Sequence, residues 1–494
     1  MSAELSGWQL SGVISSPHLA NDILEMAILM TTDRILGITV LADFILSEGI
    51  DRIIENLLRV GATSVACNPT VTSPAPQGEG SFQPPLDAGS SPREFDRELF
   101  GKRSAWLYSA PSYSPNPAFY SDSVYGPRVV KELSYRLGSL IGDFIEAAKA
   151  AGLRVYLQLG AVQPTGLRDE DRPRQVDGSV APVPLADTGS LASSAIRAYN
   201  RAYVKDLLAT YPEISGFRID WPEYPCYTMS ELFHDFSPHV EQWACANGFD
   251  FQRIRTGVGE LYQYLSGKLT RVQLMATRDL KIDRAFVNLT GEFNGAVAEW
   301  LKLKATLSAD LVADWRAALV AAGRPELELT AHAFMPPYST MTGLDFTNVL
   351  AHCDFVSPKF YTMHWPLMVK FWSEWLVERN GHLDYKDVMR TVASWMELGS
   401  TSEIEERLGR YKYPKSDEEH PIPIRVQQRK LEEVRQYFSA KPASLVPLVH
   451  GYGPLEDFAS RFQMVAESEV QGLWINRYGY LSDEKLAVIE QSWS

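Results

Sequence analysis

The sequence is poor in cysteine, with only four residues of this type, Cys67, Cys226, Cys245 and Cys353. None of them belongs to a Cys-x-x-Cys pair, so the chain lacks both the usual spacing of zinc-binding cysteines and a paired-cysteine redox motif. We expect free, buried thiols, which are typical of proteins in a reducing compartment.

Long apolar runs are also missing. No stretch approaches the roughly 20 apolar residues that a membrane-spanning helix needs. The first residues, MSAELSGWQLSG, do not combine a basic segment with an apolar run, so no secretory signal is predicted. These absences predict a cytoplasmic protein without a membrane partner.

Positive charge is scarce too, because 47 Lys and Arg stand against 61 Asp and Glu, for a net charge of −14. Nucleic acid attracts basic surfaces, so it is not expected as a partner. The content of 45% hydrophobic residues is that of a globular protein. The 12 Trp and 22 Tyr suit the stacking of sugars as well as an ordinary core. The sequence leaves open whether the protein is a homo-oligomer.

Apolar runs alternate with helical patterns along the chain, which favours a parallel α/β sheet. For example, GFRID follows the helical pattern AIRAYNRAYVKDLLATYP. Eight strand candidates lie near residues 38, 64, 155, 217, 329, 355, 445 and 473. Eight βα units that close on themselves form a (β/α)8 TIM barrel. A doubly wound open sheet with an appended domain is less favoured, because no G-x-G-x-x-G loop follows the first strand.

Such a barrel needs only about 250 residues, so a chain of 494 residues must contain large insertions. We place the barrel at 35–494, with βα-loop insertions at about 72–138, 161–192, 226–300 and 376–440. Residues 1–34 are predicted to form an N-terminal extension packed on the barrel. Long βα loops build the substrate pocket at the C-terminal mouth of a barrel.

Polar residues stand at the carboxyl end of every predicted strand. Because side chains alternate along a strand, those in phase with its last inward residue point into the same mouth. The fourth strand gives Asp220, in phase with Arg218 and followed by Trp221. The other strands give Asp43, Asn68, Gln158, His332, Lys359, Tyr361, His450 and Asn476. A single residue of this kind could be an ordinary core group, but a complete set predicts a substrate-binding site at the mouth.

The stretch GFRIDWPEYP, residues 216–225, places two carboxylates among aromatic and proline residues. Such pairs suit glycoside hydrolysis, in which one carboxyl protonates the leaving oxygen and the other is the nucleophile or activates water. Asp220, fixed by its strand, suits the nucleophile or base. Glu223 suits the acid, with a pKa raised by desolvation. Alternatively, each pairs with Arg218 or Lys359.

A second acid could also come from the segment GEFNGAVAEW, if the long insertion folds over the mouth. Its two carboxylates are Glu292, which we count among the substrate-binding candidates, and Glu299. The ordinary alternative for both is a solvated helix face.

The segment GFRID, with Arg two residues before Asp, resembles the fourth-strand nucleophile segment of the α-amylase superfamily. This resemblance implies that Asp220 is the nucleophile. The fifth strand departs from that pattern, because it ends in His332 and not in a glutamate.

A broader resemblance, over about residues 35–490, is to barrel proteins identified as hypothetical glycoside hydrolases. It is carried by VDGSVAPVPLADTGS, AIRAYNRAYVKDLLATYP, ANGFDFQRIR and EWLKLKATLSADLVADWRAAL. Those proteins have a D-x-x-E/Y-P end to the fourth strand, which here falls on Asp220, Glu223, Tyr224 and Pro225.

We therefore predict a glycosidase that acts on a carbohydrate, with Asp220 and Glu223 as the catalytic pair and with neither metal nor cofactor. Three alternatives remain. A metal-dependent sugar isomerase would use Asp43, Asp220, His332 and His450, although no H-E-x-x-H or H-x-H spacing occurs. A Schiff-base lyase of the aldolase kind would use Lys359. A non-catalytic barrel would only bind carbohydrate.

Overall fold

The computed structural model describes residues 34–85, 93–181 and 186–493. The chain from Ile35 onward forms one compact unit. The predicted N-terminal extension at 1–34 lies outside the described residues except for Arg34.

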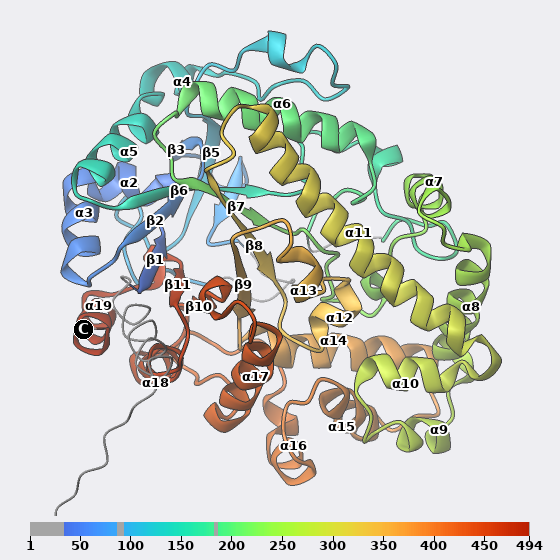
Figure 1. Ribbon diagram of the computed structural model, residues 1–494. Coiled ribbons are helices and arrows are strands. Elements are labelled where there is room, and N and C mark those ends of the chain that lie inside the picture. Colours follow the sequence, from blue (N-terminus) through green and yellow to red (C-terminus); the bar gives the residue numbers. More distant parts are fainter. Residues whose placement is uncertain (1–33, 86–92, 182–185, 494) are drawn as a thin grey trace, which may run out of the picture. The chain divides into compact units, whose positions relative to one another are not determined.

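Eight parallel strands close into a barrel at the centre of this unit (Figure 1). Each strand pairs with the barrel strands before and after it in the chain, and the first pairs with the last through Ile38 and Ile475. The barrel strands are β1 (Ile35–Thr39), β2 (Ser64–Cys67), β6 (Arg154–Gly160), β7 (Gly216–Asp220), β8 (Glu328–Ala333), β9 (Phe355–Phe360), β10 (Leu448–His450) and β11 (Gly472–Asn476). The predicted (β/α)8 barrel is therefore confirmed.

Helices surround the barrel and fill the connections between its strands (Figure 1). Before β8 they are α2 (Ala42–Glu48), α3 (Ile50–Arg59), α4 (Glu132–Leu137), α5 (Leu140–Ala150), α6 (Ser194–Thr210), α7 (Pro238–Ala246), α8 (Phe251–Gln263), α9 (Arg271–Ala276), α10 (Ile282–Leu289) and α11 (Asn294–Ala321). After β8 they are α12 (Tyr338–Thr342), α13 (Phe346–Val349), α14 (His364–Arg379), α15 (Tyr385–Trp395), α16 (Thr401–Arg407), α17 (Ile424–Tyr437), α18 (Leu455–Ala466) and α19 (Asp483–Ser492). None of the described helices is both long and apolar enough to cross a membrane.

The connection after β2 contains a small antiparallel sheet in the order β3-β5-β4. Its strands are β3 (Thr70–Pro74), β4 (Ser81–Gln83) and β5 (Ala105–Pro111). No strands were predicted here, because proline and serine interrupt each apolar run. This sheet is important for the site, since it lines a cavity at the barrel mouth.

The cysteines agree in part with the prediction of free, buried thiols. All four cysteines are free, and Cys67, Cys226 and Cys353 are buried. Cys245 is exposed, on the outer helix α7, so the prediction that all four would be buried is wrong for this residue.

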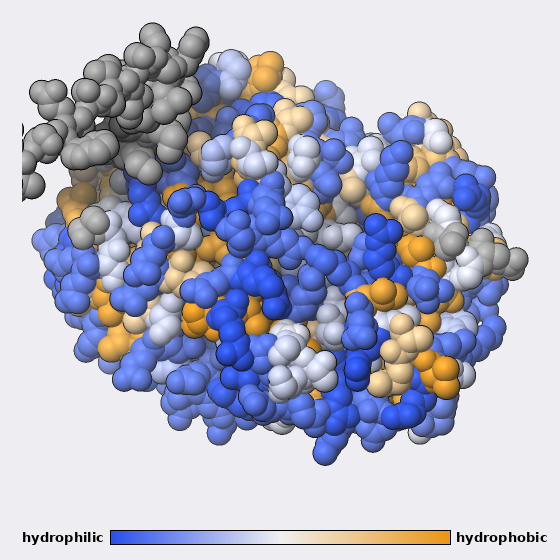
Figure 2. Space-filling view, turned by 60° about the horizontal axis from the view of Figure 1, so that its bottom comes forward, coloured by the Kyte–Doolittle hydropathy of each residue, from blue (hydrophilic) through white to orange (hydrophobic). Residues whose placement is uncertain are grey.

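On the face shown in Figure 2, hydrophilic residues predominate and apolar ones gather in small separate groups.

The alternation of side chains gives the barrel two separate cores. Inward residues of several strands, among them Tyr156, Leu448 and Trp474, form a cluster inside the barrel. Outward residues such as Phe217 and Ile475 belong to the larger core between the strands and the helices. Side chains at alternate positions of each strand therefore point into the barrel, and the last of them points into the mouth, as the sequence predicted.

Inside the barrel, β1 has no side chain at Gly37 because the Trp474 ring fills that space. A Cβ atom added at Gly37 would lie only 2.2 Å from the Trp474 ring. We expect Gly37→Ala to lower the free energy of unfolding by about 1–3 kcal/mol, since an overfilled core has to distort. Urea denaturation measures the change.

The matched control for this prediction is Gly142→Ala in helix α5. A Cβ atom at Gly142 would lie 4.0 Å from its nearest neighbour, Tyr211, and alanine favours a helix over glycine by about 1 kcal/mol. The control is expected to be as stable as the wild type or more so. Equal stability of both variants would contradict the close approach of Trp474 to β1.

Candidate functional site

The carboxyl ends of β7, β8 and β9 bring an acid, a histidine and a lysine together at the mouth. Lys359 Nζ of β9 lies 2.6 Å from Asp220 Oδ1 at the end of β7. The Nδ1 atom of His332 of β8 lies 3.5 Å from the same oxygen. The side chain of Asp220 keeps 26% of its surface exposed, whereas Lys359 is 3% exposed. Asp220 is thus the member of this group that solvent or a ligand reaches.

The surroundings of Asp220 keep its carboxylate ionised. Burial by itself would raise the pKa of Asp220, but the charge of Lys359 and the contact with His332 hold that pKa well below its ordinary value. The backbone N–H of Trp221 also donates to Asp220 Oδ1 at 3.0 Å. A carboxylate fixed in this way suits a nucleophile or a general base.

Two basic residues below Asp220 are buried in the barrel. Burial, together with the charge of Arg218, lowers the pKa of His332 to about 4, so its imidazole is neutral near pH 7. Both ring nitrogens of His332 lack a hydrogen-bond partner among the described residues. The guanidinium of Arg218 lies 3.6 Å from the centre of the Trp474 ring. Burial lowers the pKa of Arg218 to about 9, which leaves it charged at neutral pH.

The chain turns sharply immediately after Asp220. Trp221 has a φ of 61°, in the left-handed region that a bulky side chain rarely adopts. The turn places the Trp221 ring against Lys359, with 4.2 Å between the ammonium nitrogen and the ring centre. Strained backbone of this kind gathers at functional sites, and here it helps to hold the lysine next to Asp220.

Glu223, the second predicted catalytic carboxyl, is fully buried. Its Oε1 accepts a hydrogen bond of 2.6 Å from the backbone N–H of Phe334, and Oε2 lies within hydrogen-bond distance of Thr342 Oγ1. Burial raises the pKa of Glu223 to about 7, although Lys359 acts in the opposite direction. Asp220 and Glu223 therefore have pKa values shifted in opposite directions, although only two residues separate them.

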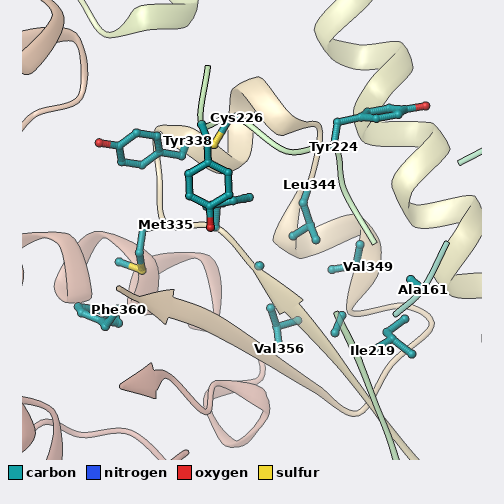
Figure 3. Packing of buried hydrophobic residues seen from close by; sticks show 14 of the residues in the cluster. Ala161, Ile219, Tyr224, Cys226, Met335, Tyr338, Leu344, Val349, Val356 and Phe360 are labelled. Atoms are coloured by element: carbon teal, nitrogen blue, oxygen red, sulfur yellow. The ribbon is translucent and has the colours of Figure 1, made fainter. Parts of the chain in front are cut away.

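The segment between β8 and α13 holds Glu223 in place. Lys304 of α11 is buried and donates to the carbonyl oxygens of Leu232 and Met341, and Lys430 of α17 donates to that of Pro336 at 2.8 Å. Figure 3 shows the apolar layer beside this segment, in which Leu344 and Val349 lie above the strand residues Ile219 and Val356. Packing and buried amines together fix the segment from which Glu223 receives its hydrogen bonds.

A cavity of about 280 Å³ lies at the mouth, beside Asp220 and over β1, β2 and β6. It reaches Gly160, which is the register partner of Asp220 on the neighbouring strand. Three residues of the predicted site line it, namely Asp43, Asn68 and Gln158. The remaining wall comes from the antiparallel sheet, helix α6 and the segment after β11.

Asp43 reaches this cavity in another way than the sequence predicted. β1 ends at Thr39, and Asp43 lies in the first turn of helix α2, not on the strand. Burial raises the pKa of Asp43, against the effects of Thr72 and Arg477. The prediction of its position on the strand was wrong, because a helix can begin only three residues after a strand.

Asn68 and Gln158 are joined to each other at the strand ends. The side-chain amide of Asn68 donates to the backbone oxygen of Gln158 at 2.7 Å. Thr39 Oγ1 lies 3.4 Å from Gln158 Oε1. These contacts hold the floor of the cavity and leave the amide nitrogen of Gln158 as a donor toward the space above.

The remaining predicted residues form a separate polar and aromatic group over β9, β10 and β11. Asn476 donates to the Tyr361 hydroxyl at 2.7 Å, and the Tyr361 and His450 rings lie 4.9 Å apart. His450 Nδ1 accepts the backbone N–H of Tyr452, and burial lowers the pKa of His450 well below its usual range. None of these residues lines the cavity.

The segment suggested as an alternative source of acid lies on outer helices. Glu299 of α11 pairs with Arg253 of α8 at 3.1 Å, so it occupies the ordinary helix face that we named as its alternative. Glu292 belongs to a short helix, η6 (Gly291–Phe293), and its side chain lies outside what the structure describes.

Several residues that line the cavity were not predicted from the sequence. Arg128 comes from the insertion after β2, Arg477 directly follows β11, and Tyr199 and Tyr203 belong to helix α6. The spacing of the two tyrosines, four residues apart on a helix, placed them on one face, but no pattern indicated that this face would meet the mouth.

The four residues of the isomerase alternative do not form a ligand set. Asp220 and His332 are adjacent, but Asp43 lies in the cavity wall and His450 is in the aromatic group. Over the described part of the chain, no group of three or more His, Cys, Asp or Glu side chains is placed to hold a metal ion.

No protein-family model matches the chain. No curated protein matches it either. Among solved structures, the chain is similar to the β-galactosidase of the psychrophilic Marinomonas ef1, with 9% identity and a TM-score of 0.46 over 92% of this chain and 58% of that one. The present chain thus spans just under three fifths of the length of that enzyme.

Two further structures match along almost their whole length. The catalytic domain of the β-amylase from Paenibacillus polymyxa has 10% identity and a TM-score of 0.44, over 93% of this chain and 97% of that one. The Group IV chitinase of Ostrinia furnacalis has 9% identity and a TM-score of 0.40, over 93% and 100%. At these identities the likeness concerns the barrel and says nothing about activity.

Proposed function

We propose that this protein is a glycoside hydrolase whose centre lies at the barrel mouth, with Asp220 as the ionised carboxylate and Glu223 as its protonated partner. The observation that supports this most is the opposite shift of two neighbouring carboxyls, one held well below its usual pKa and the other raised to about 7. Pairs of carboxyls with separated pKa values divide the roles of base or nucleophile and acid between them.

In this proposal the acid gives its proton to the glycosidic oxygen while the bond from that oxygen to the anomeric carbon breaks. Asp220 either attacks the anomeric carbon or takes a proton from the attacking water. Water supplies the hydroxyl group of the released sugar, and the acid regains its proton. Lys359 keeps Asp220 ionised and positioned throughout this sequence.

Asp43 is the second candidate for the acid. Glu223 is buried, and both of its oxygens already have hydrogen-bond partners. To protonate the substrate, it would have to give up one of these two hydrogen bonds. Asp43 lines the cavity directly, and its pKa is also raised by burial. The test is the hydrolysis of a panel of aryl α- and β-glycosides by the wild type and by Asp220→Asn, Glu223→Gln and Asp43→Asn. If the protein binds sugars but hydrolyses no glycoside, the alternative of a barrel that only binds carbohydrate would replace the hydrolase proposal.

The Schiff-base alternative leads to a separate prediction about Lys359. An imine-forming lysine needs the lone pair of its nitrogen, and a lysine held 2.6 Å from a carboxylate does not offer it. We expect borohydride treatment in the presence of keto-sugars or keto acids to add no mass to the peptide that contains Lys359. A mass increase on that peptide in the wild type, absent from Lys359→Met, would replace the glycosidase proposal with a lyase.

A further inference from the structure

Two arginines, Arg128 and Arg477, line the cavity beside Asp220. Within the described residues, neither Arg128 nor Arg477 forms an ion pair, and Arg477 Nε is buried without a hydrogen-bond partner. The guanidinium carbon of Arg128 lies 5.9 Å from the centre of the Tyr203 ring, which supports the side chain but does not use its N–H groups. Both side chains thus have donors left for a ligand.

Many other arginines of the protein form ion pairs with carboxylates. Arg97 binds Glu48 and Asp483, Arg197 binds Asp310, and Arg461 binds Asp457. With a net charge of −14, the chain has acidic residues in excess to pair with its arginines. Two guanidiniums that line one small cavity, one of them with a buried and unpartnered Nε atom, therefore offer a site for an anionic ligand.

The charges of the cavity lining leave one positive charge uncompensated. Asp43 is the one carboxylate among the described residues that line the cavity, and the charge of Arg477 favours its ionised form against the effect of burial, which raises its pKa. Arg128 has no such neighbour in the lining. A monoanion restores the balance, whereas a dianion would leave an excess of negative charge.

We propose that the cavity is an anion subsite that binds the carboxylate of an acidic sugar of the uronic acid class, with Arg128 as its principal ligand and Arg477 beside it. This assignment rests on the proposed glycoside hydrolysis. The planar guanidinium matches a carboxylate through two parallel hydrogen bonds. The cavity that would hold the sugar reaches Gly160, one strand from Asp220.

The rest of the lining suits a sugar ring. Asn68, Gln158 and Gln163 offer side-chain amides toward hydroxyl groups. Tyr199 and Tyr203 stack on each other with 5.5 Å between ring centres and form an aromatic wall. A volume of about 280 Å³ lies just below the range of about 300 to 1,000 Å³ that is usual for ligand pockets, so the cavity suits a single sugar residue.

The kinetic test compares substrates that differ only in the anion. These are 4-nitrophenyl glucuronide against glucoside and galacturonide against galactoside, in both anomers. We expect the wild type to favour the uronide, and Arg128→Gln to reduce the uronide-to-neutral ratio of kcat/KM by about 10- to 100-fold, as loss of a charged hydrogen bond does. Arg128→Lys keeps the charge but cannot form two parallel hydrogen bonds. Its ratio should lie between those of the wild type and Arg128→Gln. The control Arg201→Gln, on the outer face of α6 beside Asp314, should leave the ratio as it is.

A binding test separates this subsite from the proposed hydrolysis. Calorimetry with free glucuronate, galacturonate, glucose and glucose 6-phosphate should show that a uronate binds best, and that Arg128→Gln removes that preference. Uronate binding that depends on Arg128, without hydrolysis of any glycoside, supports the subsite and overturns the hydrolase. Hydrolysis without preference for uronides, or an equal loss on both substrates in Arg128→Gln, overturns the subsite. Tighter binding of glucose 6-phosphate than of either uronate overturns the assignment to a carboxylate.

Discussion

Replacing Asp220 with asparagine is expected to lower the kcat/KM for glycoside hydrolysis by about 10²- to 10⁴-fold, the range found when a positioned acid or base is lost. The amide keeps the size of the carboxylate, so its oxygen still accepts the hydrogen bond of Lys359. It supplies neither a nucleophile nor a base. Steady-state kinetics on the best aryl glycoside measures the loss.

The fold of this variant has to be checked independently, because Lys359 is almost completely buried and loses its charged partner. Removing one charge of a buried ion pair costs about 3–5 kcal/mol, and the hydrogen bond that the asparagine oxygen keeps with Lys359 reduces this cost. Urea denaturation of Asp220→Asn should therefore show a smaller free energy of unfolding but a single cooperative transition. The control Asp314→Asn removes a carboxylate that pairs with Arg201 between α6 and α11, and should keep full activity. Full activity in Asp220→Asn as well would remove Asp220 from the mechanism.

The barrel and part of its mouth were predictable from the sequence because both depend on local periodicity. The alternation of side chains placed Arg218, Asp220, His332 and Lys359 on inward faces, and closure of the barrel brought three of them into contact. The same reasoning placed Asp43 wrongly on β1, because it cannot tell the last strand residue from the first residues of a following helix.

The wall of the cavity was not predictable in the same way. Arg128 comes from an insertion, and Tyr199 and Tyr203 come from a helix, about 70 residues further along the chain. Only tertiary packing brings these three residues together with the strand ends. The weak apolar character of β3, β4 and β5, which contain Ser and Pro, also hid the sheet that supports this wall.

The protonation state of Glu223 is expected to affect both stability and activity strongly. A protonated carboxyl fits the contacts around this residue. A protonated Oε2 donates to Thr342 Oγ1, while the Thr342 hydroxyl donates to the backbone oxygen of Ser339 at 3.0 Å. Oε1 still accepts the N–H of Phe334. Glutamine can make the same two hydrogen bonds and leaves that from Thr342 to Ser339 in place, so Glu223→Gln is expected to fold with the segment after β8 in place.

Stability should then depend on pH in the wild type and less so in Glu223→Gln. Burial raises the pKa of Glu223 from 4.5 to about 7, so the folded protein binds this proton more tightly than the unfolded chain does. Its contribution to stability is full below about pH 4.5 and is lost as the pH rises through about 7. At 1.36 kcal/mol for each pKa unit, the loss amounts to about 3 kcal/mol. Urea denaturation between pH 4 and 8 should show this slope in the wild type and in the control Glu299→Gln, whose carboxylate pairs with Arg253 on outer helices.

The activity of Glu223→Gln decides whether Glu223 is the acid or only positions the segment around it. If it is the acid, kcat/KM of the wild type falls as the pH rises through about 7, and the variant loses about 10²- to 10⁴-fold. Asp43→Asn then keeps more activity than Glu223→Gln, because Asp43 lines the sugar subsite but transfers no proton. The opposite pattern, with Glu223→Gln active and Asp43→Asn inactive, would transfer the acid role to Asp43 and leave Glu223 as a positioning residue. A wild-type protein with no pH-dependent difference in stability from Glu223→Gln would contradict the protonated state itself.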